Sequence, residues 1–529
     1  DKDYAKLYVR RGRNLKEFKV SEADTKWGNP EFTYTDKAAY QHKTYDFAIS
    51  LETLGIEQPT AGENIDLAFA AYGTATPAYL ATDTAYDEEY QRYLIVYVNS
   101  DGYVTGQMVN EDGSLYESEF TISENQYSYY PSIVHNPGST NFLVIFEGTT
   151  LGYGIFGQIV TPDGTLDGGN FQISDGSALT PANARGAHDN IYNQFLVVWE
   201  DERNGSDKDI YGQVLDGGTL SPLGDNLPVM VAAGDQYDPA IAFDGSAEKY
   251  LAAWADDRTE TTYWDIYGRV IDVDGTLNGD EFAISAGGSN RRRNPAIAYD
   301  PVNQLFSVVW EHGLTDPENI FGNYLIIRSA DYINSAYVTL RSAAPCDLNA
   351  TIGCIVMGLF DGDFPVSTAL DYQQNPYITH DSSEFLTVWD DLRSSGSYGK
   401  DIYGRYIGVD PTDLTPDLTA SEFTIVTSSD EESDPSLAYN PLLDDTLLAW
   451  RNYTDPPDTY GYIILGGDPT GSISGYVVDN LGAGIANVNI NAYNDTLDEN
   501  FSATTGIDGF YELTGIPAGC YDLDINAWP

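Results

Sequence analysis

Three segments of the sequence place acidic residues and an arginine directly after a tryptophan. They are WEDER at 199–203, WADDR at 254–258 and WDDLR at 389–393. A carboxylate and a guanidinium beside an aromatic ring could bind the hydroxyl groups of a glycan. The pattern recurs, however, whereas a catalytic centre is needed only once. We therefore predict ion pairs that fasten a loop to the next strand, namely Asp201–Arg203, Asp257–Arg258 and Asp391–Arg393.

The histidines do not form a metal-binding pattern. Three of them stand where equivalent segments carry an aromatic residue, so we predict a packing role: His135, His188 and His380 align with Phe243, Tyr299 and Tyr439. His42 and His312 are isolated. The sequence contains no HExxH, no Cys-x-x-Cys, no glycine-rich phosphate loop and no G-x-S-x-G elbow. We therefore predict no catalytic residue from motifs.

Aspartates next to glycine make two weak candidates for calcium ligands. They lie in DVDG at 272–275 and DGDF at 361–364, and the candidate ligands are Asp272, Asp274, Asp361 and Asp363. Neither segment has the ligand spacing of an EF-hand, and Asp-Gly hairpin turns produce the same letters. Calcium is the one cofactor that we consider, and the sequence indicates no other.

Two cysteines lie close together in PCDLNATIGC, inside an insertion in the repeat described below. Cys346 and Cys354 could close a small disulfide loop, which would indicate an oxidising compartment. Cys520 is left over, and we expect it to be a buried strand residue.

Arg291, Arg292 and Arg293 form the only basic cluster in a very acidic sequence. We expect them in a loop between the fourth and fifth repeat units. Two interpretations are open: the loop is simply solvated, or it is a docking point for an acidic neighbour such as another copy of the chain.

These segments are positioned by a repeat. DIYGQVL occurs at 209–215, DIYGRVI at 265–271 and DIYGRYI at 401–407, with looser copies at 103–109, 154–160, 319–325 and 459–464. Most copies are about 50–57 residues apart, a period that indicates repeated supersecondary units.

Each repeat unit reads as four short strands. The clearest unit spans 238–285: DPAIAFD, YLAAWADDR, WDIYGRVIDVDGTL and EFAIS. The pieces are rich in aromatic and β-branched residues, and the Asp-Gly at 274–275 predicts a hairpin turn. Four antiparallel strands repeated radially form a β-propeller. The predicted fold class is therefore all-β, with a propeller flanked by β-sandwich modules.

We count seven units, whose second strands end at Tyr97, Phe146, Trp199, Trp254, Trp310, Trp389 and Trp450. The seventh unit lacks an obvious fourth strand. EFKVS at 17–21 could supply it and close the ring, since closure removes exposed edges. A six-bladed propeller with one degenerate unit is the alternative.

The first 78 residues permit a second interpretation, which we favour. TYDFAISLETLGI at 44–56 and NIDLAFAAYGTATP at 64–77 resemble the closing strands of a carbohydrate-binding-like or DOMON-like β-sandwich. EFKVS would then belong to that module, whose first half would precede Asp1.

The C-terminal segment has a different pattern. GSISGYVVDNLGAGIANVNI is followed by Gly506-Ile507-Asp508-Gly509-Phe510-Tyr511 and by Pro517-Ala518-Gly519-Cys520-Tyr521. These motifs resemble the carboxypeptidase regulatory-like domain, a small transthyretin-like β-sandwich. The resemblance implies a structural or adhesive module of secreted proteins. The expected organisation is thus 1–78 sandwich-like, 79–471 propeller and 472–529 regulatory-like.

Composition narrows the partners. The 529 residues carry a net charge of −55, and 40 are tyrosine. Such a field repels phosphate backbones, so we expect no nucleic-acid partner. No apolar run reaches the length of about 20 residues that a membrane span needs. We expect a segment of a longer, processed precursor.

The repeat resembles those of secreted bacterial and archaeal surface proteins, which implies an extracellular or cell-surface location. We expect a non-catalytic protein that binds, adheres or assembles, with a glycan, a surface protein or copies of itself as partner. The first alternative is a polysaccharide-cleaving hydrolase or lyase, which needs a pair of carboxylates at a set separation. The second is a subunit of an extracellular filament or sheath. A repeat-breaking acid pair facing the central channel would favour the enzyme.

Overall fold

Every regular element in the described part of the chain is a β-strand. The computed structural model describes residues 4–11, 14–21, 66–71, 81–148, 153–258, 263–287, 290–313, 318–329, 341–342, 355–359, 362–393, 399–410, 414–427, 431–452, 458–465, 471–477, 485–486, 488–494, 499–506, 510–516 and 522–526. The chain divides into one compact unit of Gly73–Ile464 and a second that contains Asp1–Tyr72 and Leu465–Pro529.

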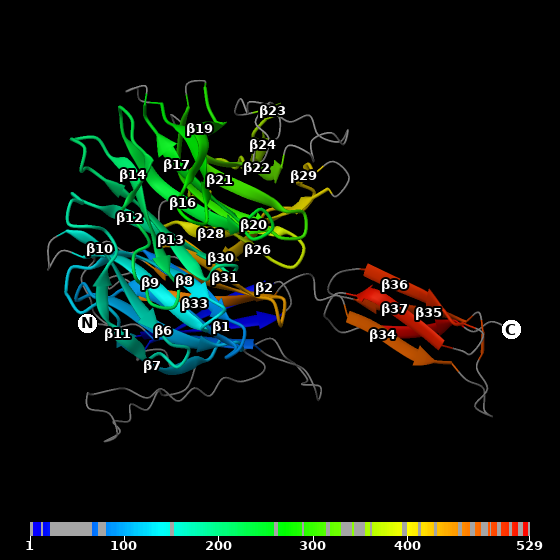
Figure 1. Ribbon diagram of the computed structural model, residues 1–529. Helices are drawn as coiled ribbons and strands as arrows, with labels where there is room; N and C mark the ends of the chain where they lie inside the picture. The colour runs from blue at the N-terminus through cyan, green and yellow to red at the C-terminus, as the bar shows by residue number, and fades with distance from the viewer. Residues whose placement is uncertain are drawn as a thin grey trace, which may run out of the picture. The chain divides into compact units, whose positions relative to one another are not determined.

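The unit Gly73–Ile464 is a seven-bladed β-propeller, whose blades follow one another in chain order (Figure 1). The strands of each blade are antiparallel and are called A to D from the centre outwards. Blade 1 contains β4 (Thr82–Asp87), β5 (Arg92–Val98), β6 (Val104–Asn110) and β7 (Leu115–Thr121). Blade 2 contains β8 (Tyr129–Asn136), β9 (Asn141–Gly148), β10 (Gly154–Val160) and β11 (Leu166–Gln172). Blade 3 contains β12 (Ala182–Asp189), β13 (Gln194–Asp201), β14 (Asp209–Asp216) and β15 (Leu227–Met230).

The remaining blades deviate more from one another. Blade 4 contains β16 (Gln236–Asp244), β17 (Lys249–Asp256), β18 (Asp265–Asp272) and β19 (Leu277–Ser285). Blade 5 contains β20 (Arg291–Asp300), β21 (Leu305–Gly313), β22 (Asn319–Ser329) and β25 (Phe364–Ser367), with β23 (Arg341–Ser342) and β24 (Ile355–Leu359) inserted before β25. Blade 6 contains β26 (Gln373–His380), β27 (Phe385–Asp391), β28 (Asp401–Val409) and β30 (Phe423–Val426), with the short β29 (Pro416–Asp417) beside β28. Blade 7 contains β31 (Glu432–Asn440), β32 (Asp445–Asn452) and β33 (Asp458–Leu465).

The seven A strands form a closed ring. Each packs beside the A strand of the next blade, in the order β4, β8, β12, β16, β20, β26 and β31, and β31 returns to β4. The predicted propeller is therefore confirmed with seven blades, and the six-bladed alternative is wrong. Blade 7 packs on blade 1 through Ala438, Leu447 and Ala449, which cluster with Tyr86 and Tyr93.

The register places four strand ends of each blade at one edge. In blade 4, Gln236 at the start of strand A pairs with Asp256 at the end of strand B. Asp256 also pairs with Asp265 at the start of strand C, and Ile266 pairs with Ser285 at the end of strand D. The B–C loops and the D–A connections therefore emerge on one side, called the loop face. The A–B and C–D hairpin turns lie on the other side, called the turn face.

The repeated glycine provides room for an aromatic ring of strand D. A Cβ atom built on Gly157 would lie 2.6 Å from the ring of Phe171, closer than any real contact. The recurring glycine of strand C and the recurring phenylalanine of strand D therefore form one unit of packing. This explains why the DIYG-like and EF-x-I-like phrases occur together in the sequence.

The recurring tryptophan of strand B packs between its own blade and the preceding one. Trp199, Trp254, Trp310 and Trp389 are fully buried. Each belongs to a hydrophobic cluster that combines residues of its own blade and of the blade before it. Burying rings of this size is a large part of the stabilisation that holds the blades together.

EFKVS at 17–21 lies in β2 (Asn14–Ser21), which pairs with β1 (Tyr4–Arg11). β1 also pairs with β3 (Asp66–Ala71), so these strands form a three-stranded antiparallel sheet. Among the described strands, β33 has no fourth-strand neighbour in blade 7. The sheet order thus gives EFKVS a partner other than blade 7. The segment 44–56, on which the sandwich interpretation also rests, lies outside the described residues.

The C-terminal residues form two small antiparallel sheets. One pairs β34 (Gly471–Tyr476) with β37 (Phe510–Ile516). The other places β35 (Asn489–Asn494) between β36 (Glu499–Thr504) and β38 (Asp522–Asn526). Ile490 and Val488 are buried there. In the described residues of the whole chain, no helix is long and apolar enough to cross a membrane.

Candidate functional site

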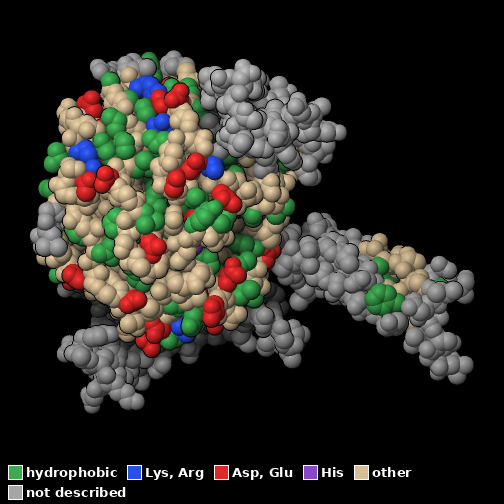
Figure 2. All heavy atoms as spheres, in the orientation of Figure 1, with side chains coloured by type: hydrophobic (Ala, Val, Ile, Leu, Met, Phe, Trp, Pro, Cys, Tyr) green, Lys and Arg blue, Asp and Glu red, His purple; other side chains and the backbone are tan. Residues whose placement is uncertain are grey.

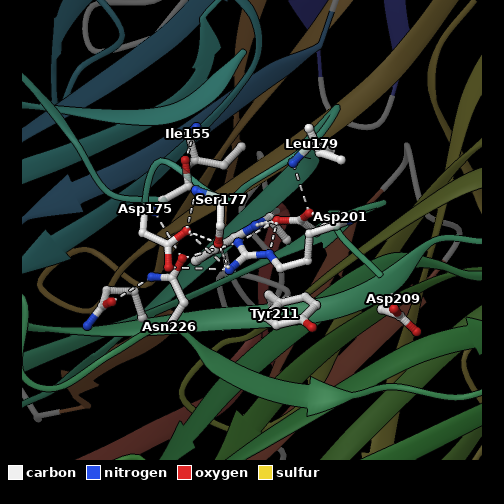
Figure 3. Close-up of polar contacts among 12 residues, drawn as sticks. Ile155, Asp175, Ser177, Leu179, Asp201, Asp209, Tyr211 and Asn226 are labelled. Atoms are coloured by element: carbon white, nitrogen blue, oxygen red, sulfur yellow. Dashed lines mark hydrogen bonds and ion pairs between the residues drawn. The ribbon is translucent and has the colours of Figure 1, made fainter. Parts of the chain in front are cut away.

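The tryptophan–acid–arginine segments lie on the loop face, where strand B ends. In blade 3, the indole N–H of Trp199 donates to Asp201 Oδ2 over 3.0 Å, and Arg203 Nη2 pairs with the same oxygen at 2.6 Å. Arg203 also bonds Asp175, Ser177 and Asn226 from neighbouring connections (Figure 3). The carboxylate of Asp201 is fully buried. The predicted bracing ion pair is therefore present in blade 3.

Blade 6 repeats this arrangement, and blade 4 corrects the sequence prediction. In blade 6, Trp389 and Arg393 both bond Asp391 Oδ2. In blade 4, Trp254 and Arg258 bond Asp256, at 2.9 and 2.8 Å, so the predicted pair Asp257–Arg258 is wrong. The common pattern is Trp-x-Asp, because alternate residues of a strand point to the same side and bring the aspartate level with the indole.

Each of these arginines also lies on the tyrosine of the DIYG phrase. The guanidinium carbon is 4.1 Å from the ring centre of Tyr211 in blade 3, 3.7 Å from that of Tyr267 in blade 4 and 4.2 Å from that of Tyr403 in blade 6. Figure 3 shows Tyr211 beneath this network. The two most obvious phrases of the repeat thus meet in a cation–π contact, which stabilises the loop and leaves the arginine fully engaged.

A second set of acids joins successive blades around the central channel. The residue after the aromatic of strand B accepts a hydrogen bond from the backbone N–H of a residue in strand A of the next blade. The acceptors and donors are Glu147 with Asn183, Glu200 with Asp238, Glu311 with Asn375 and Asp390 with Asp434, at 2.8, 2.8, 2.8 and 3.1 Å. All four donor residues have a positive φ, between 49° and 54°, at the point where the A strand bulges. These carboxylates therefore anchor a bulge of the neighbouring blade.

Cations balance three of these four carboxylates. Lys208 pairs with Glu200 at 2.6 Å, Arg293 with Glu311 at 2.6 Å and Lys400 with Asp390 at 3.1 Å. Glu200, Glu311 and Asp390 are buried almost completely. A buried carboxylate with a cation and several hydrogen bonds is held in place, and removing one partner is costly.

Glu147 and Asp238 differ from the balanced acids. Neither forms an ion pair with any residue that the structure describes, and both are half-buried. Burial, together with the negative charge of Glu200, raises the pKa of Glu147 to about 7, although the hydrogen bond from Asn183 lowers it. Burial and the charge of Glu200 likewise raise the pKa of Asp238 to about 7. These two carboxyls therefore titrate near neutral pH.

One contact crosses the central channel. Tyr377 of blade 6 donates its hydroxyl to Asp83 Oδ1 of blade 1 over 2.8 Å, although blade 7 separates the two. The backbone N–H of Ile133 in blade 2 donates to the other oxygen of Asp83. Burial raises the pKa of Asp83, and the positive charge of Arg185 in blade 3 opposes this shift. Asp83, Arg185 and Tyr377 occupy equivalent positions of their A strands. The residue type at this position therefore differs from blade to blade.

The histidines pack as predicted. His135, His188 and His380 lie 4.9–5.1 Å from the rings of Phe142, Phe195 and Phe385. His135 Nε2 also lies 2.7 Å from Asp87 Oδ2 of blade 1. No three acidic, histidine or cysteine side chains of the described residues come together as a metal site.

The calcium candidates are engaged in local contacts where they are described. Asp272 accepts from Asn278 and pairs with Lys249, Asp274 accepts from the backbone of Thr276, and Asp363 bonds Ser285 and Asn323. Asp361 and the cysteines Cys346 and Cys354 lie outside the described residues. Calcium binding and the disulfide stay predictions.

The arginine cluster does not lie in a loop, which corrects the sequence prediction. Arg291, Arg292 and Arg293 begin strand β20. Arg292 is buried and bonds Asp265 at 2.9 Å, and Arg293 bonds Glu311 and Glu318. Arg291 instead lies over the ring of Trp264, 4.8 Å from its centre. Two of the three charges are thus used inside the propeller.

Sequence reasoning did not find the inter-blade acids or the Asp83–Tyr377 contact. The inter-blade acids could have been found from the sequence, because an acid directly follows the strand-B aromatic residue in four blades: Glu147, Glu200, Glu311 and Asp390. No sequence pattern indicates the contact between Asp83 and Tyr377, since they are 294 residues apart and meet only when the ring of blades closes.

Comparisons with known proteins identify one family, in the C-terminal segment. Residues 472–527 match the family model of the carboxypeptidase regulatory-like domain, which confirms the resemblance seen in the sequence. No curated protein sequence matches the chain.

Solved structures resemble the chain at low identity. The β-propeller domain of Cps50 (Swd1) from Myceliophteria thermophila has 10% identity and a TM-score of 0.43, covering 75% of this chain and 100% of that chain. The β-propeller domain of the Trilobed protease from Pyrococcus furiosus has 8% identity and a TM-score of 0.42, covering 74% and 96%. An α-L-arabinanase from Penicillium chrysogenum, complexed with arabinobiose, has 12% identity and a TM-score of 0.40, covering 64% and 93%. At these values we transfer no function from them.

Proposed function

We propose that the chain is a non-catalytic extracellular or cell-surface protein that binds a polysaccharide on the loop face of its propeller. The observation that carries this proposal is the use of the channel acids. Glu200, Glu311 and Asp390 each hold a bulge of the next blade and a cation, and they are buried. Carboxylates engaged in this way hold the ring together, and none of these three is left free to act on a substrate.

Exposed aromatic and apolar side chains on the loop face support binding. Tyr127 and Leu179 lie in D–A connections and are 57% and 55% exposed, and Tyr153 lies in a B–C loop and is 66% exposed. Tyrosine offers apolar area together with a polar hydroxyl at low cost in conformational entropy. Such side chains suit the sugar rings and hydroxyls of a glycan. The regulatory-like module at 472–527 is consistent with a surface protein.

The test is incubation of the purified chain with a panel of soluble and insoluble polysaccharides, with and without calcium. We expect retention of the protein without release of new reducing ends. Tyr153→Ser should weaken retention, whereas Tyr90→Ser on the turn face, which removes a side chain 50% exposed, should not. Release of reducing ends by the wild type would contradict the non-catalytic proposal. Loss of retention on chelation would add a structural calcium ion.

One observation favours a second function, a polysaccharide-cleaving hydrolase. Glu147 and Asp238 are half-buried carboxyls with pKa values raised to about 7, as a general acid at neutral pH requires. If released sugar ends are found, Glu147→Gln and Asp238→Asn should each reduce the release by at least about 100-fold. An unchanged rate in both variants would place the activity elsewhere.

A further inference from the structure

Arg291 is unlike the other cations of the propeller. Among the lysine and arginine side chains that the structure describes, it alone has neither a hydrogen bond nor an ion pair. It instead makes a cation–π contact with the ring of Trp264. In a chain with a net charge of −55, a guanidinium without an acidic partner is unexpected. Asp265, which follows Trp264 in the sequence, bonds Arg292 instead.

Blade 4 departs from the repeat where Arg291 lies. Blades 3 and 6 carry Lys208 and Lys400 directly before the DIYG phrase, and each lysine pairs with the acid that directly follows the strand-B tryptophan. Blade 4 carries Trp264 and Ala255 at these two positions. The lysine–carboxylate pair is thus replaced by an aromatic ring and a methyl group. This substitution creates the surface on which Arg291 rests.

The aromatic surface continues beyond Trp264. The ring of Tyr237 stacks on Trp264 with their centres 5.1 Å apart, and Lys208 Nζ lies 5.0 Å from the centre of Tyr237. Tyr263, next to Trp264, is 37% exposed on the same face. The contact with the Trp264 ring restricts the Arg291 guanidinium, so less conformational freedom is lost when it binds a ligand.

A planar guanidinium recognises a carboxylate by two parallel N–H···O bonds, and neighbouring aromatic edges suit a sugar ring. We propose that Arg291, held on Trp264, is the contact for a carboxylate-bearing sugar unit of the bound polysaccharide. This inference rests on the proposed glycan binding and names its ligand class. It also narrows the docking prediction for the arginine cluster to one residue.

The test compares two matched probes, an oligogalacturonate and its fully methyl-esterified form, by isothermal titration calorimetry. Charge-assisted hydrogen bonds contribute about 1.5–3 kcal/mol, so Arg291→Gln should weaken binding of the acidic probe by roughly 10- to 100-fold. The affinity of Arg291→Lys for the acidic probe should lie between those of the wild type and Arg291→Gln. Lysine keeps the positive charge but cannot donate two parallel hydrogen bonds. Binding of the esterified probe should be the same in all three proteins. Tyr90→Ser on the turn face is the control.

Two further readouts make the outcome decisive. Trp264→Lys, which restores the residue of blades 3 and 6, should also weaken the acidic probe, and circular dichroism should show that each variant is folded. Equal binding of the acidic probe by Arg291→Gln and the wild type would overturn the inference, because Arg291 is then only solvated. Retention of the wild type on neutral polysaccharides alone would overturn it and leave the proposed function standing. If the wild type binds no polysaccharide, both fail.

Discussion

Arg258 lies over the ring of Tyr267, with its guanidinium carbon 3.7 Å from the ring centre, while Asp256 bonds the same guanidinium. The aspartate also accepts the indole N–H of the buried Trp254. One carboxylate thus ties together the end of strand B, the B–C loop and the start of strand C. Neighbouring Asp257 takes no part in these bonds.

The first prediction follows from this difference. Asp256→Asn should lower the free energy of unfolding by about 2–4 kcal/mol, because the partly buried Arg258 then keeps only its ion pair with Glu281 and the buried Trp254 loses a charged acceptor. Asp257→Asn should cost less than Asp256→Asn, because Trp254 and Arg258 bond Asp256. Urea unfolding followed by tryptophan fluorescence measures both. A larger loss for Asp257→Asn would restore the pairing that the sequence suggested.

The second prediction concerns the glycine of the repeat. Gly157→Ala should destabilise the propeller by about 1–3 kcal/mol, since its Cβ would meet the ring of Phe171. Gly176→Ala, where nothing lies within 4 Å of the added carbon, is the control and should be nearly neutral. In the Phe171→Leu background, the penalty of Gly157→Ala should shrink. An unchanged penalty would show that the contact with Phe171 is not its cause.

The strands and the number of blades could be predicted because the same strand and turn motifs occur in several blades. The alternation of apolar and polar residues, the Asp-Gly turns and the contact between the strand-C glycine and the strand-D phenylalanine all lie within a single blade. Asp256 was missed because the letters Asp-Asp-Arg offer two candidates, and only strand pleating shows which carboxylate is level with Trp254. Arg291 was placed in a loop because three consecutive arginines lack the usual alternation of a strand.

Contacts across the ring were beyond sequence reasoning for a different reason. Tyr377 and Asp83 meet only after all seven blades are in place. Nothing in the residues around either position indicates the other. The same holds for the paired Trp264 and Arg291, whose significance depends on which neighbouring acids are already used.

The third prediction is a pH dependence of stability. The folded-state pKa values of Glu147 and Asp238 are about 7, above the ordinary values of 4.5 and 3.8. Between the ordinary and the raised value the folded state binds more protons than the unfolded state, so stability falls as pH rises through this range. We expect the melting temperature to be higher at pH 5 than at pH 7.5.

The double variant Glu147→Gln/Asp238→Asn isolates these two groups. It should flatten the decline between pH 5 and pH 7.5, because the substituted amides do not titrate. Differential scanning calorimetry at both pH values measures the effect in wild type and variant. An equally steep decline in the variant would assign the pH dependence to other acids or to the overall negative charge.

The fourth prediction tests whether the inter-blade acids hold the ring together. Asp390 is 1% exposed and bonds Lys400, Ser433, Asn375 and the backbone N–H of Asp434 in the next blade. Asp390→Ala should therefore cost about 3–5 kcal/mol, because Lys400 loses its partner and several buried donors lose their acceptor. Glu89→Ala, an exposed acid in the A–B turn of blade 1, is the charge-matched control and should stay within about 0.5 kcal/mol of the wild type. Hydrogen exchange would localise the effect, with faster exchange in β31 of blade 7 than in β12 of blade 3. A small loss of stability, or an equal rise in exchange in both blades, would mean that Asp390 does not act as a specific link between blades 6 and 7.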